Sequence, residues 1–435
     1  MNIPKTDLPR VVIIGGGFSG MSLAKRLLKK KIQVALLDRH NYHTFQPLLY
    51  QVSTAGLEPD SIAYPLRKIT RDSHRGFYRM AEVTAIDAEK KCIYYNIGDL
   101  TFDYLVIATG SKTNFFGNKN IEENAMQMKS VPHALNIRSL ILENLEQAVI
   151  TENPEERKAL MNFVLAGAGP TGVELSGAIA ELRNQILPKD YPDLDANQMK
   201  IHLIEGFKRV LPTMSEDSSE KAQKFLKELG VNIHLNTRVK SYDGKMVTTD
   251  INLCLNTSTF IWTAGVTGAP LMGLNGSALI EKANRYKVNV FNQVNGYENI
   301  FALGDIAVMS TKDFPEGHPM VAQPAIQQGN HLAKNLVRLL KGEKMEPFEY
   351  RDKGTMATVG RNRAVVDLGK LRFGGFFAWY IWMFVHLWFL IGFRNRLVTF
   401  IDWVNNYINY DKGDRLIIHP FKKIKKSMGS EEVTK

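Results

Sequence analysis

A glycine motif near the start of the chain is the first feature that could carry out chemistry. Gly15-x-Gly17-x-x-Gly20 lies between an apolar stretch at residues 11–14 and a segment of helical composition. Gly15 permits a tight turn, Gly17 lets the backbone approach a pyrophosphate, and Gly20 lets the helix pack closely on the strand. Asp38 ends the next apolar strand, where a carboxylate accepts hydrogen bonds from ribose hydroxyls. The motif predicts a dinucleotide-binding turn.

A second copy of this pattern occurs further along the chain. Gly167-x-Gly169-x-x-Gly172 again follows an apolar strand, and Glu205 ends the next one. The interval before Glu205 is longer than the usual ~20 residues, and we attribute the excess to a polar insertion at residues 184–198. An acid at this position repels a 2′-phosphate, so Glu205 predicts NADH rather than NADPH.

Four polar residues near these motifs allow two interpretations each. Glu174 is either a first-turn acid favoured by the helix dipole or a carboxylate near the nicotinamide that handles protons. Asp305, after the strand at residues 299–304, either caps a loop or bonds a ribityl or ribose hydroxyl. Gln323 and Gln327 share one helix face and either bind a carbonyl-bearing ligand or form a solvated helix start.

The elements that position these residues form two strand–turn–helix–strand repeats. They cover residues 10–38 and 162–205. Each repeat predicts two parallel strands joined by a right-handed helical connection. Buried strands are also predicted at residues 102–111, 260–266 and 299–306. We expect an α/β protein with two doubly wound, Rossmann-like domains.

Composition excludes several other classes of protein. The chain has 435 residues, a net charge of +11 and two distant cysteines, Cys92 and Cys254. These cysteines argue against a disulfide framework, a zinc site and a redox-active pair, and no histidine has metal-ligand spacing, so no metal site is predicted. No nucleic-acid-binding module is visible. The first residues lack an apolar signal segment, so we expect a cytoplasmic body.

The C-terminal composition differs from the rest of the chain. Residues 376–393 are almost wholly apolar, and Leu397, Ile401, Val404 and Ile408 follow at helical spacing. This segment could be a monotopic anchor, a membrane span or a buried or dimer helix. Its aromatic content and a basic tail (Lys422, Lys423, Lys425 and Lys426) favour the monotopic anchor on an anionic membrane surface.

Several motifs together resemble the type II, non-proton-pumping NADH:quinone oxidoreductases. The shared motifs are VVIIGGGFSG, the block at residues 45–67, VIATGS, GAGPTGVELSGAIAE, FALGD, AQPAIQQG and HLWFLIGFRNR. The resemblance implies that FAD is held by Gly15, Gly17, Gly20, Asp38, Thr109, Gly110 and Asp305. It also implies that NADH lies around Gly167, Gly169, Gly172, Glu174 and Glu205, and that Gln323 and Gln327 line a quinone site. Residues 376–410 would form the membrane anchor.

The resemblance also implies that the second domain is inserted in the first. We expect an FAD domain at residues 1–115 and 290–345, an NADH domain at 116–289 and an anchor or dimer region at 346–435. The expected enzyme passes a hydride from NADH to FAD and two electrons to a membrane quinone, as a homodimer on the cytoplasmic face of the inner membrane. The alternatives are a soluble FAD-dependent reductase of a protein electron carrier, a disulfide- or sulfide-oxidising flavoprotein, and a non-catalytic NADH sensor.

Overall fold

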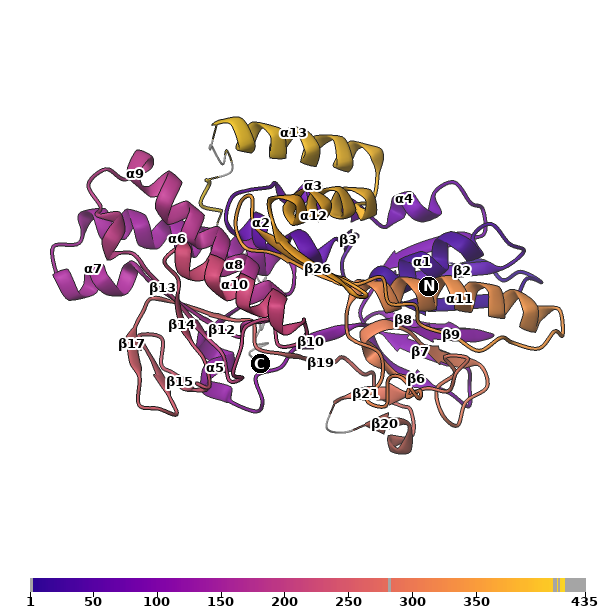
Figure 1. The fold of residues 1–435 in the computed structure, drawn as a ribbon. Helices are drawn as coiled ribbons and strands as arrows, with labels where there is room; N and C mark the ends of the chain where they lie inside the picture. Colours follow the sequence, from indigo (N-terminus) through magenta and orange to yellow (C-terminus); the bar gives the residue numbers. More distant parts are fainter. Residues whose placement is uncertain (1–2, 281–282, 410–412, 414, 419–435) are drawn as a thin grey trace, which may run out of the picture.

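The first sheet of the protein has five parallel strands, with the first glycine motif at its centre (Figure 1). The structure is a computed structural model, and it describes residues 3–280, 283–409, 413 and 415–418. The strands, in spatial order, are β22 (Ile300–Ala302), β9 (Tyr104–Ile107), β1 (Arg10–Ile14), β2 (Gln33–Asp38) and β5 (Gly76–Met80). Most of their residues are buried, as expected for a parallel sheet covered on both faces.

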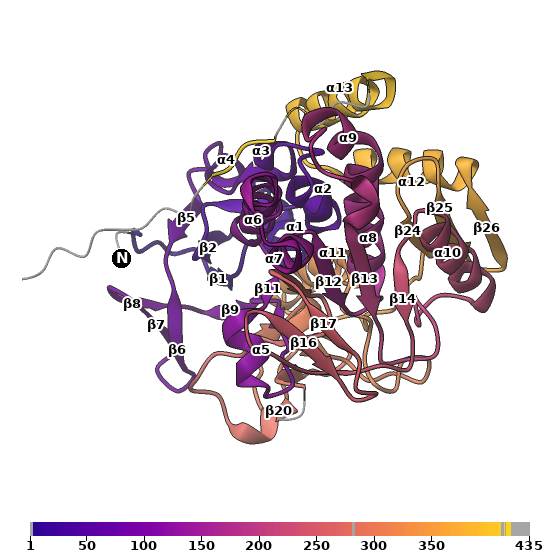
Figure 2. The same cartoon turned by 90° about the vertical axis from the view of Figure 1, so that its left-hand side faces the viewer.

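A second five-stranded parallel sheet carries the second glycine motif (Figure 2). Its strands, in spatial order, are β11 (Met126–Gln127), β18 (Thr259–Trp262), β12 (Asn162–Ala166), β13 (Lys200–Ile204) and β14 (Asn232–His234). The chain returns to the first sheet at β22 only after completing the second. The predicted fold class, with one doubly wound domain inserted in another, is confirmed, while the predicted domain limits stay predictions.

Helices cover both sheets. In the first domain α1 (Phe18–Leu27) packs on α11 (Ala322–Leu340), and a Cβ at Gly329 would collide with the carbonyl oxygen of Ser19, so the two backbones nearly touch. The second domain carries α6 (Val131–Ile150) and α8 (Pro170–Glu181). The other α-helices before the C-terminal region are α2 (Leu49–Ser53), α3 (Pro59–Ile62), α4 (Arg67–Thr70), α5 (Lys119–Asn124), α7 (Pro154–Leu160), α9 (Leu187–Asp190) and α10 (Glu216–Glu228).

Short strands in small sheets complete the two domains. A two-stranded ribbon joins them, because β10 (Ser111–Thr113) pairs with β19 (Val266–Gly268). The remaining strands form small sheets: β3 (Tyr42–Thr44) with β4 (Ala63–Pro65); β6 (Val83–Asp87), β7 (Cys92–Tyr95) and β8 (Gly98–Thr101); β15 (Val239–Tyr242), β16 (Met246–Thr249) and β17 (Cys254–Asn256); and β20 (Leu279–Ile280), β21 (Arg285–Lys287) and β23 (Ala307–Val308).

The segment interpreted as a polar insertion begins as a continuation of α8. A π-helical turn at Leu182–Ile186 leads into α9, and the side chains of Ile186 and Leu187 are buried in the core. Only the part after α9 is a loop with a short 3₁₀ turn. The extra residues are therefore partly helical, and two buried apolar side chains anchor residues 184–190 to the domain.

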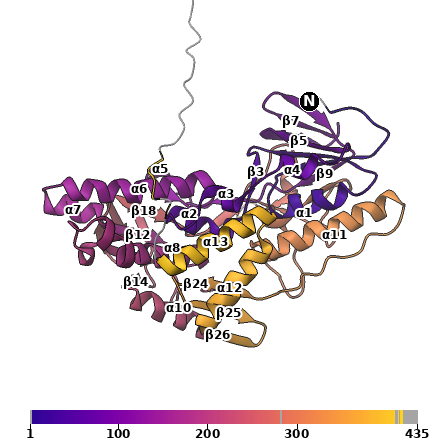
Figure 3. The ribbon, with the colours of Figure 1, turned by 90° about the horizontal axis from the view of Figure 1, so that it is seen from above.

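The C-terminal region is an antiparallel three-stranded sheet followed by two helices. The sheet consists of β24 (Thr355–Thr358), β25 (Ala364–Leu368) and β26 (Leu371–Gly375). The helices α12 (Phe376–Phe389) and α13 (Phe393–Asn409) lie along one outer surface of the molecule (Figures 1 and 3). Gly392, with φ of +90°, separates them, so the apolar run at residues 376–393 is not one helix. Within the described ranges, no helix combines the length and the apolar character that crossing a bilayer requires. The basic tail from Lys422 to Lys426 lies outside the described residues.

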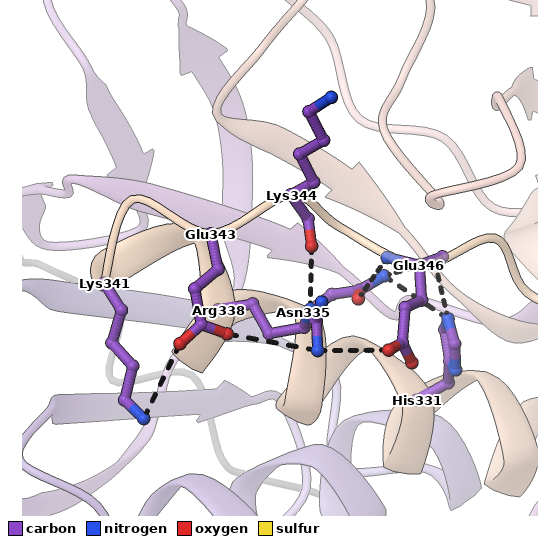
Figure 4. A network of polar contacts seen from close by, with 7 residues as sticks. All are labelled: His331, Asn335, Arg338, Lys341, Glu343, Lys344 and Glu346. Carbon is purple, nitrogen blue, oxygen red and sulfur yellow. Dashed lines mark hydrogen bonds and ion pairs between the residues drawn. The ribbon is translucent and has the colours of Figure 1, made fainter.

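A polar network reverses the chain after α11 (Figure 4). Asn335 exchanges two hydrogen bonds with the backbone of Glu346, at 2.8 and 2.9 Å. Arg338 donates through Nε to the carbonyl of Lys344 (2.7 Å) and pairs through Nη1 with the Glu346 carboxylate (3.0 Å). The network sends the chain back along α11 toward the first turn of that helix.

Candidate functional site

The first glycine turn has no room for side chains at two positions and open space at a third. A Cβ at Gly15 would collide with the carbonyl oxygen of Ala108, and one at Gly20 would collide with the carbonyl oxygen of Gly15. Gly15 also has φ of +108°, a conformation that favours glycine. A Cβ at Gly17 would meet no described atom within 4 Å, although α1 begins there. That open space at a helix N-terminus fits the pyrophosphate of a dinucleotide.

The second turn repeats this arrangement. A Cβ at Gly172 would collide with the carbonyl oxygen of Gly167, which has φ of +99°, whereas Gly169 faces open space at the start of α8. Gly167 and Gly172 therefore have the tight-turn and close-packing roles that their spacing predicts, and binding of a pyrophosphate at Gly169 stays a prediction.

The two acids are held in the same way in both domains. Asp38 accepts a hydrogen bond from the backbone N–H of Gly16 (2.6 Å), and its other oxygen accepts one from the residue two positions later (2.7 Å). Glu205 accepts from the backbone N–H of Ala168 (2.6 Å) and from that of Phe207 (3.0 Å). Each carboxylate is thus fixed beside its own glycine turn and keeps lone pairs for ribose hydroxyls.

One cleft of about 690 Å3 joins the first turn to the second domain. The predicted site residues in its wall are Gly15, Gly17, Asp38, Thr109, Gly110, Glu174 and Asp305. Gly20 packs under the first turn, while Gly167, Gly169, Gly172 and Glu205 form the second turn outside this wall. The link between the two is α8, which starts at the second turn and contributes Thr171 and Glu174 to the cleft.

Glu174 is a buried carboxyl group in the cleft wall. Because α8 begins at Pro170, Glu174 lies beyond the first helical turn, which disfavours the helix-dipole interpretation. Burial raises the pKa of Glu174 well above its ordinary value, and a hydrogen bond from the backbone of Thr358 opposes that shift only in part. Burial therefore favours the protonated, neutral form of this carboxyl group over the carboxylate.

Asp305 is tied to several residues that the sequence analysis did not identify. Its carboxylate accepts from the Ser111 hydroxyl (2.5 Å), and Lys129 donates to the same hydroxyl oxygen (2.8 Å). The Gln328 side chain accepts from the backbone N–H of Gly304 (2.7 Å) and so fixes the turn before Asp305. Burial lowers the pKa of Lys129, and the Asp305 carboxylate opposes that shift. No sequence spacing relates these residues, because they come from separate parts of the chain.

Gln323 and Gln327 share a helix face, as predicted, but their amides contact the C-terminal segment. Gln323 donates to the carbonyl of Gly354 (2.8 Å) and accepts from the backbone of Lys353 (3.1 Å). Gln327 bonds both backbone groups of Arg351 (2.9 and 3.1 Å). Further along the same face, His331 and Asn335 both form hydrogen bonds with the backbone carbonyl of Glu346. These four side chains, spaced four residues apart on α11, form a polar ladder. A direct catalytic role for the two glutamines stays a prediction, since Val321, Ala322 and Ala325 line the cleft instead.

Comparisons with known proteins agree with this geometry. Residues 9–329 match the family model of the pyridine nucleotide-disulphide oxidoreductases, and residues 353–409 match the NDH2 C-terminal domain. The type II NADH:quinone oxidoreductase Ndh of Mycobacterium tuberculosis is 35% identical over 94% of this chain and 90% of its own. A type II NADH:quinone oxidoreductase of Staphylococcus aureus is 29% identical over 82% of this chain and 89% of its own.

Solved structures share the fold. NDH2 from Plasmodium falciparum, solved in complex with NADH, superposes with a TM-score of 0.86 at 24% identity, covering 94% of this chain and all of that one. The sulfide:quinone oxidoreductase of Aquifex aeolicus superposes with a TM-score of 0.70 at 19% identity, covering 95% and 96% of the two chains.

Two dinucleotide turns on two doubly wound sheets define an oxidoreductase of the pyridine nucleotide-disulphide class. Neither Cys92 nor Cys254 lies in the cleft, so the chain lacks the cysteine pair on which disulfide chemistry depends. The chain belongs to the family of type II NADH:quinone oxidoreductases. Its cofactors are FAD and NADH, which the two turns fit.

Proposed function

We propose that this enzyme oxidises NADH through FAD and passes two electrons to a membrane quinone without pumping protons. The observation that carries the proposal is the shared cleft, whose wall combines the first glycine turn with Thr171 and Glu174 from the helix of the second turn. Two dinucleotides bound at these turns would approach each other in this cleft.

The protein positions the reactants and supplies charge and protons. FAD, when bound, accepts a hydride from NADH and gives two electrons to the quinone. Backbone N–H groups at the start of α11, next to Val321 and Ala322 in the cleft wall, direct positive partial charge at the flavin site. Quinone reduction also consumes protons, and Glu174 lies in the cleft wall, where burial favours the protonated form that could donate one.

A second cavity supports a separate approach for the quinone. It has a volume of about 400 Å3 and lies between α8 and the two C-terminal helices, with Trp379, Trp382 and Trp403 in its wall. Tyr50 is buried and lines both this cavity and the cleft. We place the quinone's route past Tyr50, from the surface formed by α12 and α13 into the cleft.

This route predicts a selective defect in Tyr50→Leu. The KM for quinone is expected to rise about tenfold, corresponding to about 1.4 kcal/mol, because the boundary between the cavities loses its aromatic ring. The rate of flavin reduction by NADH is expected to stay unchanged in stopped-flow measurements. Tyr50→Phe keeps the ring and serves as the control, and equal quinone KM values in both variants would contradict the route.

The C-terminal helices support attachment to a membrane surface. In α13, Asn395 donates to the backbone carbonyl of Ala63 (3.0 Å), Asn406 to that of Gly56 (3.0 Å), and Trp403 to the Gln51 side chain (2.8 Å), so polar groups face the protein. Large apolar side chains face outward: Phe376, Phe377, Phe384 and Trp388 in α12, and Phe393, Leu397, Phe400, Ile401 and Ile408 in α13. We propose that this face lies in one leaflet of the membrane. The homodimer and the cytoplasmic side of the inner membrane stay predictions.

A spectrum of the detergent-extracted protein tests the proposed function. The flavin band at roughly 450 nm is expected to bleach when NADH is added without oxygen, and to return when a quinone analogue follows. Bleaching that only a protein electron carrier reverses would replace the quinone with that carrier. A flavin that NADH does not bleach would overturn the enzymatic proposal altogether.

A further inference from the structure

Lys129 is a charged residue that the second domain contributes to the flavin cleft. It follows β11, a strand of the second sheet, and precedes Ser130, the N-cap of α6. Its side chain is half-buried in the cleft wall. Its ammonium group donates to the Ser111 hydroxyl at 2.8 Å, and that hydroxyl donates to the Asp305 carboxylate at 2.5 Å.

The direction of these hydrogen bonds is fixed by the groups involved. An ammonium group only donates and a carboxylate only accepts, so the single Ser111 proton goes to Asp305 and the Ser111 oxygen accepts from Lys129. Lys129 belongs to the second domain, Ser111 to the connecting strand β10, and Asp305 to the first domain. An ion pair bridged by one hydroxyl therefore crosses the domain boundary in the wall of the cleft.

The charges in the cleft give this bridge a second consequence. Among the described residues in the wall, the arginine and lysine side chains are those of Arg39 and Lys129. Arg39 follows Asp38 at the ribose end of the cleft and is exposed, whereas Lys129 lies at the Asp305 end. A dinucleotide with two pyrophosphate charges enters this cleft, and a hydride adds further negative charge during the reaction. A cation beside Asp305 offsets the carboxylate's repulsion of that charge.

We infer that Lys129 is a positioning residue of the flavin site, supplied by the NADH domain. It holds Asp305 through Ser111 and sets both the affinity of the protein for FAD and the reduction potential of the bound cofactor. The inference rests on the FAD site of the proposed function and is independent of the quinone.

The test compares Lys129→Gln, which keeps a donor but removes the charge, with Lys112→Gln. Lys112 is an exposed lysine on the same ribbon, one residue after Ser111, so both variants lose one charge. Two quantities are measured without quinone: the dissociation constant of FAD from deflavinated protein, by flavin fluorescence, and the midpoint potential of the bound flavin, by equilibration with a reference dye.

For Lys129→Gln we expect FAD affinity to fall about tenfold. The potential is expected to fall by about 30 mV, which is a tenfold change in the equilibrium constant of a two-electron couple. Lys112→Gln should change neither quantity, and Ser111→Ala should weaken FAD binding as Lys129→Gln does.

Two results would overturn the inference. One is a Lys129→Gln protein whose FAD affinity and potential both equal those of Lys112→Gln. The other is a loss of affinity at unchanged potential, which would make the bridge a structural tie only. If Lys129→Gln fails to fold, Lys129→Arg, which keeps the charge, takes its place. Its FAD affinity and its midpoint potential must then equal those of the wild-type protein. If quinone does not reoxidise the reduced flavin of the wild-type protein, the proposed function is refuted. The measurements of FAD affinity and midpoint potential remain valid in that case, because they are made without quinone.

Discussion

Substitution of Gly172 by valine is expected to impair NADH oxidation severely while the protein keeps its FAD. A Cβ at this position collides with the backbone carbonyl of Gly167 and lies 2.9 Å from the Thr263 hydroxyl, so α8 must move away from β12. Such a shift displaces the second turn but leaves the first domain's turn intact. We expect kcat/KM for NADH to fall at least about 100-fold, or about 2.7 kcal/mol.

The measurement is NADH consumption, with bound flavin quantified from the same sample. Gly276→Ala is the matched control, because a Cβ there meets no described atom within 4 Å. Dithionite should still reduce the flavin of the Gly172→Val protein, since the glycine turn of the first domain, which binds FAD, does not contain this residue. NADH oxidation within tenfold of wild type would show that the second turn does not hold the nicotinamide dinucleotide.

Replacement of Glu174 by glutamine is expected to slow quinone reduction about 100-fold or more, the usual contribution of a general acid. Burial raises the pKa of Glu174, so the wild-type side chain holds its proton to a higher pH than an exposed glutamate does. Donation is therefore available at low pH and is lost as pH rises through the raised pKa. Wild-type turnover should fall on that alkaline limb, whereas the Glu174→Gln protein should lack it.

The raised pKa of Glu174 also predicts how the stability of the folded protein depends on pH. The native state holds the Glu174 proton more tightly than the unfolded chain does, so this contribution to stability is complete below the unfolded pKa and disappears as pH rises through the folded pKa. Glu174→Gln should consequently be more resistant to unfolding than wild type at alkaline pH. Glu181→Gln, on the same helix but in the wall of the other cavity, is the control. Identical pH–rate profiles for wild type and Glu174→Gln would remove Glu174 from the mechanism.

The sequence predicted the two turns well because each is local. Glycines at fixed offsets and an acid at the end of the next strand define a dinucleotide turn without knowledge of the rest of the fold, and Asp38 and Glu205 both bond their own glycine turns. The long interval before Glu205 did not matter, because the extra residues form a helical excursion between α8 and β13.

The contacts that complete the site could not be predicted in this way. Ser111, Lys129 and Asp305 meet only after two domains and a connecting ribbon have folded, and nothing in the composition around Lys129 distinguishes it from a solvated lysine. The prediction that Gln323 and Gln327 share one helix face was correct. The backbone groups that they contact, however, lie 24 or more residues later in the chain. Sequence periodicity identifies a face and cannot identify what covers it.

The apolar C-terminal helices illustrate the same limit. The spacing of Leu397, Ile401 and Ile408 predicted an amphipathic helix, and α13 is one. Periodicity alone would direct such a face toward the protein interior, yet these three side chains are 47%, 54% and 70% exposed. The asparagines and the tryptophan on the opposite side decide the orientation, because each finds a hydrogen-bond acceptor in the protein body.

Because of the polar ladder along α11, the two dinucleotide-binding domains depend on the segment that follows this helix. Residues 3–344 contain every glycine and every acid of both dinucleotide turns, so a shortened gene ending there looks sufficient for a small flavoprotein. Deletion of the following segment would strip Gln323, Gln327, His331 and Asn335 of their backbone acceptors and donors on the helix that opens onto the flavin cleft. The functional unit therefore extends past its nucleotide-binding modules, because the segment from Glu346 to Gly354 supports the helix whose first turn lines the cleft.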